Sequence, residues 1–149
     1  MSKRLPPLTA AQVASLVEEH FPQLQDGVGQ LSIERIDADE TVVRMSFDER
    51  LMRPGGSVSG PAMFKLADFG VYAAILGRLG EAGLQAVTTS MTINFLSRPQ
   101  PAAMLAHIRV LKMGRRLAVC DVSLYCEGAP ELVAHATSTY AVPPERMRG

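Results

Sequence analysis

The strongest constraint on the fold is the segment Gly55–Leu79, in which a glycine-rich turn runs into a helix that is apolar on nearly every side. Ser57 and Ser59 are both suitable N-caps for this helix, and Pro61 suits its first turn, where a missing N–H group leaves no hydrogen bond unmade. A helix without a polar face is normally buried in the core of a fold rather than laid on its surface. The rest of the chain is therefore expected to enclose this helix.

One carboxylate, Asp68, stands well inside the apolar helix. It shares a narrow stripe with Lys65 and Tyr72, because positions i, i+3 and i+7 lie on one side of a helix. Burying a carboxylate is unfavourable unless another group pairs with it or a reaction uses it. The residues alone leave two interpretations open: an ion pair between Lys65 and Asp68 on a partly wetted stripe, or a functional carboxylate.

Periodic patterns predict the remaining elements. Thr9–Gln12 has the pattern of a capping box and predicts a helix over about residues 10–20. Alternating apolar residues then predict a β-hairpin with strands at Leu31–Ile36 and Val42–Phe47, followed by a linker over residues 48–56. Turn residues, among them those of Lys112–Arg116, separate four further strands, expected at about Ala86–Leu96, Ala102–Leu111, Leu117–Cys126 and Glu131–Ala141.

The order of elements predicts an α+β fold in which an antiparallel sheet wraps around a long central helix. The length of 149 residues is that of one domain. Apolar residues make up 47% of the chain and the formal net charge is zero, so nothing indicates a nucleic-acid or membrane partner. The N-terminus lacks the apolar stretch of a signal peptide, and a cytoplasmic location is therefore expected.

Cysteines and histidines give no sign of a disulfide or a metal site. Cys120 and Cys126 are expected on one strand about 20 Å apart, which is too far for a disulfide. His20, His107 and His135 are widely spread and lack the spacing of metal ligands. No metal is therefore expected.

Four motifs occur in order along the chain: SGPAMFKLAD at Ser59–Asp68, AVTTSMTINFLSRP at Ala86–Pro99, GRRLAV at Gly114–Val119, and LVAHATSTYAV near the C-terminus. In order and spacing they resemble the hotdog-fold acyl-CoA thioesterases, in particular the PaaI-like branch of the phenylacetate pathway. The resemblance implies a single hotdog domain over residues 1–149, with its core at about 31–142 and an N-terminal helix at about 10–20. It also implies a homodimer joined edge to edge through its sheets, or a dimer of dimers.

The resemblance assigns catalytic roles to the start and the middle of the central helix. Asp68 falls at the position of the catalytic carboxylate, which deprotonates a water or attacks the thioester carbonyl directly. The backbone N–H of Gly60 would bind the carbonyl oxygen, since helix N-termini present free N–H groups that stabilise developing negative charge. The residues alone also allow a simpler role for Gly60, which is to permit a tight entry into the helix.

Two positions before the central helix, Arg53 and Ser59, depart from the family pattern. The family typically has His-Gly-Gly where this chain has Ser59-Gly60-Pro61. The Ser59 hydroxyl can cap the helix or donate to a carbonyl, but it cannot perform the proton chemistry of an imidazole near pH 7. Arg53 stands where some relatives carry an amide side chain, and it could supply positive charge, bind a substrate carboxylate or anchor the linker.

The first strand after the helix supplies further candidates for the site. One threonine of the pair Thr88 and Thr89 matches a hydroxyl that, in the resembling enzymes, holds the attacking water beside the carboxylate. Strict alternation allows only one of them to face the helix, and the register favours Thr88. Asn94 could face the site or the solvent.

A basic hairpin is the last candidate. In the resembling enzymes the region of Gly114, Arg115 and Arg116 lies near the nucleotide and phosphates of coenzyme A, and arginine side chains match phosphate oxygens well. Lys112 adds a further positive charge. A solvated turn is the simpler interpretation of the same residues.

Together these features predict a thioesterase that hydrolyses a small or medium acyl-CoA to the free acid and coenzyme A. No cofactor is expected, because a thioester is already activated. Loss of the family histidine and amide leaves a second interpretation open, a non-catalytic protein that binds acyl groups or acyl-CoA.

Overall fold

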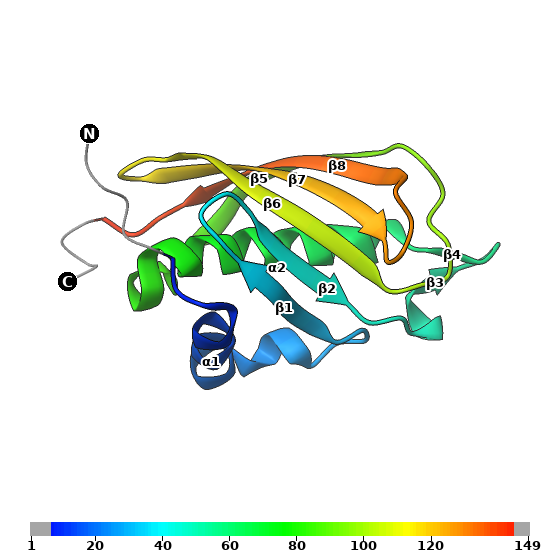
Figure 1. Ribbon diagram of the computed structural model, residues 1–149, viewed down its shortest axis with the longest axis horizontal. Helices are drawn as coiled ribbons and strands as arrows, with labels where there is room; N and C mark the ends of the chain where they lie inside the picture. Colours follow the sequence, from blue (N-terminus) through cyan, green and yellow to red (C-terminus); the bar gives the residue numbers. More distant parts are fainter. Residues whose placement is uncertain (1–6, 145–149) are drawn as a thin grey trace.

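Helix α2 (Gly60–Leu79) lies against one face of a curved, six-stranded antiparallel sheet (Figure 1). The computed structural model describes residues 7–144. Across the sheet the strands follow the order β1-β2-β6-β7-β8-β5. The predicted α+β architecture, with a sheet around a long central helix, is confirmed.

The sheet consists of strands of 5 to 10 residues. They are β1 (Leu31–Ile36), β2 (Thr41–Met45), β5 (Val87–Phe95), β6 (Met104–Met113), β7 (Leu117–Cys126) and β8 (Leu132–Ala141). The remaining elements are helix α1 (Ala10–His20), the ribbon of β3 (Met52–Arg53) and β4 (Ser57–Val58), and 3₁₀ turns at Pro22–Gln25, Glu49–Leu51 and Gly80–Gly83.

Ser59, not Ser57, caps α2. Its backbone is extended, with φ −72° and ψ 154°, and its Oγ accepts a hydrogen bond from the Ala62 N–H at 3.3 Å. Ser57 is buried in β4 instead. Gly80 follows the helix with φ 61°, a left-handed conformation that glycine adopts without strain. Both ends of α2 therefore follow from local sequence.

The sheet and α1 enclose most of α2, as the apolar sequence of the helix requires. Thirteen of its 20 residues are buried, and Leu66, Ile75 and Leu76 are completely inaccessible to solvent. Each large apolar side chain buried in this way contributes about 1.5–3 kcal/mol to stability. Phe64 is the large apolar exception, with 39% of its surface exposed.

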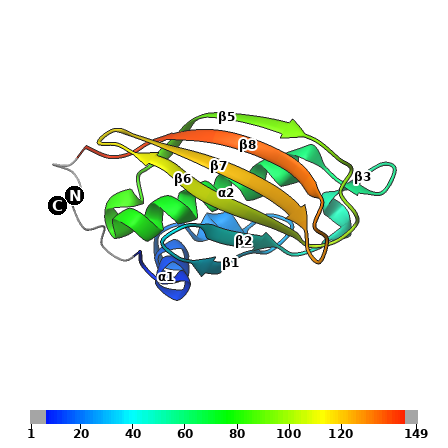
Figure 2. The same cartoon turned by 45° about the horizontal axis from the view of Figure 1, so that its top comes forward.

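Helix α1 lies alongside β1 at one margin of the sheet (Figure 2). The predicted capping box is present: the Gln12 N–H donates to Thr9 Oγ1 at 3.1 Å, and the Thr9 N–H donates to Gln12 Oε1 at 2.8 Å. Val13 and Val17 are buried beneath the helix. This helix therefore covers one end of the core.

Two predicted boundaries are wrong. The linker over residues 48–56 contains a 3₁₀ turn and the start of the β3–β4 ribbon, which turns at Gly55 and Gly56 with φ values of 100° and 83°. The predicted turn at Lys112–Arg116 is shorter, because β6 continues through Met113 after a register shift that follows Val110. A register shift depends on the neighbouring strand, and a single strand's sequence does not reveal it.

Strand β5 forms one edge of the sheet and, among residues 7–144, pairs only with β8. Large apolar side chains are exposed along it and just beyond it: Val87 is 59% exposed, Phe95 51% and Leu96 56%. An exposed apolar edge strand is a ready surface for pairing with another strand.

Gly70 allows α2 to approach the sheet closely. A Cβ atom at this position would lie 2.9 Å from Ile108 Cγ1 and 3.0 Å from Val43 Cγ2, closer than such atoms pack in proteins. Both neighbours are themselves buried on the inner face of the sheet. Little room is therefore available for either side chain to move.

Replacing Gly70 with alanine is expected to destabilise the fold by about 1–3 kcal/mol through overpacking, although alanine has the higher helix propensity by about 1 kcal/mol. Urea unfolding followed by circular dichroism measures this change. The double variant Gly70→Ala/Ile108→Val, which lacks the nearest methyl group, should recover part of the loss. A Gly70→Ala protein as stable as the wild type would contradict the close approach.

Candidate active site

The two principal candidates, Asp68 and Gly60, stand on the same helix but cannot meet. They are eight residues apart in α2, which at 1.5 Å per residue separates them by about 12 Å along the helix axis. Each lines a different cavity. Within one chain, a small group bound at one of them cannot reach the other.

Asp68 lies in the wall of a cavity of about 540 Å³. Most of the surrounding side chains are apolar, and Lys65 is the other charged residue among those described here. The apolar and aromatic members are Phe21, Leu24, Leu31, Phe64, Phe69, Tyr72, Ala86, Val87 and Tyr140. A carboxylate in such surroundings needs hydrogen-bond donors nearby.

Two hydroxyl groups from the sheet provide those donors. Thr88 Oγ1 donates to Asp68 Oδ1 at 2.7 Å, and the Tyr140 hydroxyl donates to the same oxygen at 2.6 Å. The Tyr140 oxygen also lies 3.1 Å from the main-chain oxygen of Asp68. The structure therefore brings Asp68 and Thr88 together as predicted and adds Tyr140, which the sequence analysis missed.

The position of Tyr140 carries a signal that could have revealed it. Along β8 the inward positions are Ala134, Ala136, Ser138 and Tyr140, so the period of two places the tyrosine in the core. A buried tyrosine usually has a hydrogen-bond partner for its hydroxyl group. The partner is Asp68 of α2, which lies 72 residues before Tyr140 in the chain, so the local sequence of β8 does not reveal it.

A β-bulge explains how Thr88 faces the helix. Thr88 pairs with Tyr140 and Ser90 pairs with Thr139, so Thr89 is an extra residue in β5. The bulge reverses the alternation, and from that point Met91 packs against the core. Thr89 turns its hydroxyl to the main-chain oxygen of Thr139, at 3.0 Å.

The same bulge determines where Asn94 lies. Without it, Thr88 and Asn94 would share a face, since they are an even number of residues apart. In the structure Asn94 is exposed and pairs with His135, on the outer face of the sheet. Asn94 therefore lines neither the Asp68 cavity nor the Gly60 cavity.

Burial raises the pKa of Tyr140 above its ordinary value of 10.0, and the negative charge of Asp68 raises it further. Only 3% of the Tyr140 surface is exposed. The hydroxyl therefore keeps its proton at neutral pH and acts as a donor toward the carboxylate.

Gly60 lines a second cavity, of about 580 Å³, at the start of α2. As the first residue of the helix, its N–H has no acceptor within the helix, and Pro61 contributes no N–H. Arg53 and Arg98 also line this cavity, and Arg98 donates to the Gly55 main-chain oxygen at 2.7 Å. Arg98 is a second cation at this site, and the sequence did not single it out.

The remaining candidates take other positions. Ser59 uses its oxygen to cap α2. Lys65 reaches toward the loop at Gly27, and within residues 7–144 it forms no ion pair with Asp68, which removes the simpler interpretation of that carboxylate. Arg115 and Arg116 are exposed in the β6–β7 hairpin, where Gly114 donates to the Leu117 main-chain oxygen at 2.8 Å.

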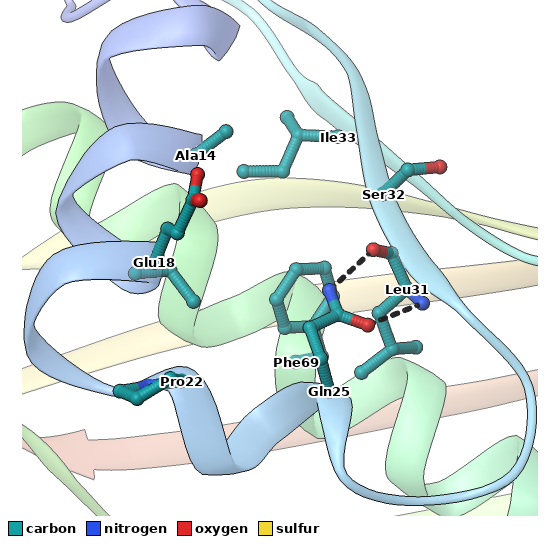
Figure 3. A pocket seen from close by; sticks show the side chains of 9 residues that line it. Ala14, Glu18, Pro22, Gln25, Leu31, Ser32, Ile33 and Phe69 are labelled. Carbon is teal, nitrogen blue, oxygen red and sulfur yellow. Dashed lines mark hydrogen bonds between the residues drawn. The ribbon is translucent and has the colours of Figure 1, made fainter.

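A third cavity, of about 360 Å³, lies between α1 and β1 (Figure 3). It shares Leu31 and Phe69 with the Asp68 cavity. Gln25 braces its margin, since its side chain donates to the Leu31 main-chain oxygen at 2.6 Å and accepts from the Leu31 N–H at 3.2 Å. Leu31 and Phe69 therefore separate two neighbouring cavities.

Neither a metal-binding cluster nor a membrane-spanning helix occurs in the part of the chain that the structure describes. Within residues 7–144, no three His, Cys, Asp or Glu side chains lie close enough together to hold a metal ion. Neither helix there combines the length and the hydropathy of a membrane-spanning segment.

Comparison with known proteins relates the chain to thioesterases. Residues 68–141 match the family model described as acyl-CoA thioesterase N-terminal domain. The crystal structure of a presumed thioesterase from Silicibacter sp. TM1040 has 39% sequence identity and a TM-score of 0.81. That similarity covers 95% of this chain and 96% of the other.

Two further relatives agree with this result. A presumed esterase from Saccharolobus solfataricus is 29% identical over 138 residues, which is 92% of this chain and 87% of the relative. The E. coli PaaI protein from the phenylacetic acid degradation operon is 22% identical, with a TM-score of 0.74 over 90% of this chain and 93% of PaaI. At that identity the likeness shows the fold, and the predicted hotdog architecture is confirmed.

The environment of Tyr140 predicts a loss of stability at alkaline pH. In the unfolded chain this tyrosine ionises near its ordinary pKa of 10.0, whereas in the folded chain it keeps its proton to higher pH. The contribution of Tyr140 to the free energy of unfolding is therefore complete below about pH 10. Above that pH it falls by up to about 1.4 kcal/mol per pH unit. Urea unfolding at about pH 8 and about pH 11 should show a smaller fall for Tyr140→Phe than for the wild type.

Tyr125→Phe is the matched control, because it removes a tyrosine hydroxyl from the outward side of β7. This variant should lose stability between the two pH values as the wild type does. If Tyr140→Phe also behaved as the wild type, the buried hydroxyl would not be the group that titrates.

Proposed function

We propose that the substrate of this protein is a small or medium acyl-CoA and that its products are the free acid and coenzyme A. The proposal starts from the fact that the chain belongs to the hotdog-fold thioesterase family and is a thioester hydrolase. The observation that carries this proposal is a carboxylate, Asp68, held by Thr88 in the wall of an otherwise largely apolar cavity. A cavity of about 540 Å³ is of the size that small-molecule sites have.

A complete site would need two copies of the chain. The carbonyl group of a thioester must meet both a base and an oxyanion donor, and Asp68 and Gly60 of one helix are about 12 Å apart. The free edge at β5 offers the means of joining two copies. If β5 pairs with its own copy in antiparallel fashion, the Thr88 end of one strand lies opposite the Phe95 end of the other.

The positions of the two cavities fit this pairing. The Asp68 cavity includes Thr88 and the exposed Phe64, whereas the Gly60 cavity includes Phe95. A twofold axis through the middle of β5 would bring the Asp68 cavity of each copy against the Gly60 cavity of the other, which gives two equivalent sites per dimer. The exposed apolar side chains of β5 would be covered in the same contact. A homodimer is therefore the proposed functional unit, and a dimer of dimers is compatible with it.

In this arrangement two copies of the chain hydrolyse one thioester together. Asp68 of one copy takes a proton from water, and the water oxygen forms a bond to the thioester carbonyl carbon. The Gly60 N–H of the other copy donates to the resulting oxyanion, a contact of a kind worth about 10²–10³ in rate. The carbon–sulfur bond then breaks, and the thiolate of coenzyme A leaves with the proton from Asp68.

The basic hairpin is suited to the phosphates of coenzyme A. Leu117 at the start of β7 and Val87 at the start of β5 both pair with Ala141, so the hairpin lies at the same end of the sheet as Thr88. Arg116 is exposed there, and Lys112 precedes it on β6. Arginine side chains can hold phosphate oxygens in a bidentate manner. A thioester is already activated, so no cofactor enters the proposal, and coenzyme A would place the protein in the cytoplasm.

The second candidate function is binding of acyl groups or acyl-CoA without turnover. It is favoured by Ser59, which stands where the family typically has a histidine and whose oxygen is engaged in the helix cap. This function predicts thermal stabilisation by acyl-CoA with no release of thiol. The catalytic proposal predicts both.

Replacing Asp68 with asparagine is expected to lower thiol release by about 10²-fold or more, because the amide cannot accept the proton from water. Release is followed with a thiol reagent over a panel of phenylacetyl, short-, medium- and long-chain acyl-CoA. Size-exclusion chromatography should give the same oligomer for both proteins. Equal rates for the variant and the wild type on every substrate would remove Asp68 from catalysis.

A mixing experiment tests whether each site uses two copies. Gly60→Pro removes the proposed oxyanion donor. Proline is accepted in the first helical turn after an extended residue such as Ser59, and a Cβ atom at this position would lie 3.3 Å from the end of the Phe95 ring, which must shift slightly. Neither Asp68→Asn nor Gly60→Pro alone should be active. Mixed dimers, formed by unfolding and refolding the two variants together, contain one intact site and should regain about a quarter of wild-type activity.

The control is the double variant Asp68→Asn/Gly60→Pro refolded with the wild type, whose mixed dimers carry one defect in each site. Mixing should add no activity there beyond that of the wild-type dimers. No recovery in the first mixture, with mixed dimers demonstrated by a tag on one variant, would contradict a site shared between copies.

A further inference from the structure

The hydrogen bonds at Asp68 fall on one of its two carboxylate oxygens. Thr88 Oγ1 and the Tyr140 hydroxyl both donate to Oδ1, at 2.7 Å and 2.6 Å. Among residues 7–144, neither hydroxyl reaches Oδ2. The two oxygens of this carboxylate are therefore not equivalent, although nothing in the covalent structure distinguishes them.

The Tyr140 hydroxyl has one proton and two acceptors within reach. The Asp68 Oδ1 atom is at 2.6 Å and the Asp68 main-chain oxygen is at 3.1 Å. The shorter contact is to the charged acceptor, and hydrogen bonds to a charged group are shorter and stronger than those between neutral groups. The proton therefore goes chiefly to Oδ1, and the main-chain oxygen is the second and weaker acceptor.

Tyr140 itself has little freedom to move. It is buried in β8 and stands directly opposite Thr88 of β5 in the register of the two strands. Both donors are thus attached to adjacent strands of one sheet, and the acceptor is attached to the helix that the sheet covers. Such an arrangement limits rotation of the carboxylate, because turning it would break two hydrogen bonds at once.

We propose that Tyr140 is a positioning residue of the active site: with Thr88 it holds Oδ1 of Asp68, and it thereby leaves Oδ2 as the atom that takes the proton from the attacking water. This inference rests on the proposed thioesterase function, and it assigns the reaction to one oxygen of the carboxylate. Oδ1 acts as an anchor, and Oδ2 is the base.

The charged and titratable groups around Asp68 are few. On its own helix they are Lys65, one turn earlier, and Tyr72, one turn later, both of which line the cavity. Tyr140 approaches from β8, and Cys120 lies on the neighbouring strand β7, where burial raises the pKa of its thiol to about 12 and keeps it neutral. The side chains that reach the cavity from the segment after α1, Phe21 and Leu24, are apolar.

Tyr140→Phe keeps the aromatic ring and removes the donor. We expect kcat to fall by about 10- to 100-fold with KM within about twofold of the wild type, because the variant binds the thioester but lets the carboxylate rotate. A variant whose cavity were merely distorted would raise KM as well.

Ser138→Ala is the matched control. Ser138 lies two residues away on the same inward face of β8, is fully buried, and donates to the Ser90 main-chain oxygen at 3.3 Å. Its loss removes a buried hydroxyl between the same two strands without touching Asp68. We expect kcat and KM of this variant to stay within about twofold of the wild type. If Tyr140→Phe matched Ser138→Ala in kcat, the inference would be overturned.

A second readout keeps this inference separate from the proposed function. Carbon-13 NMR of aspartate-labelled protein at neutral pH reports the Asp68 carboxylate directly, with Asp68→Asn identifying its signal. The chemical shift of this signal should change in Tyr140→Phe and stay in place in Ser138→Ala, whether or not any thioester is hydrolysed, because only the first variant removes a donor from Oδ1. A wild-type protein that releases no thiol would contradict the proposed function alone, whereas an unchanged Asp68 signal in Tyr140→Phe would overturn the role of Tyr140.

Discussion

The burial of α2 on nearly all sides is the constraint on which the rest of this structure depends. A helix of 20 residues with thirteen buried cannot be covered by one neighbour, so a curved sheet and α1 share the task. The sheet must come close, and small residues allow it, with Gly70 on the helix and alanines at the inward positions of β8. Any polar group on such a helix must find its partners on the sheet. Asp68 does so through Thr88 and Tyr140.

That burial also explains why the candidate active site is divided. A rigid helix holds its first turn and its middle at a fixed separation, so the Gly60 amide and the Asp68 carboxylate cannot serve one reacting group in the same chain. The sheet that encloses α2 ends in an apolar edge strand, β5, whose outer edge has no partner strand among residues 7–144 and which runs from the Asp68 cavity to the Gly60 cavity. Thus the rigid helix that leaves the site incomplete in one chain and the free sheet edge that could complete it in a dimer belong to the same architecture.

Local patterns predicted most of the fold. The capping box at Thr9, the cap at Ser59 and the alternation along β7 are each determined by residues within a few positions of one another, and the structure has these elements close to where they were expected. The predicted boundaries were wrong where the structure of one segment depends on its pairing with another segment. The β3–β4 ribbon needs two short strands to pair, and the end of β6 depends on a register shift against β7.

The candidate site divides in the same way. The sequence indicated Asp68 and Gly60 because an isolated carboxylate and a helix start are local features, and Thr88 because of its register. It did not indicate Tyr140, which lies 72 residues beyond Asp68 in the chain. Nor did it separate Thr88 from Asn94, since that needed the bulge at Thr89. The catalytic roles of these residues stay predictions, and their positions are now known.

The amino-acid sequence by itself determined which segments form helices and strands, and it required that one helix be enclosed, because periodicity and capping act between residues close together in the chain. The tertiary structure alone decided that Thr88 and Tyr140 meet at one oxygen of Asp68, that Asn94 faces outward, and that β5 lies at the edge of the sheet. These outcomes depend on how strands align across the sheet. A shift of one residue there reverses which side chains face the core.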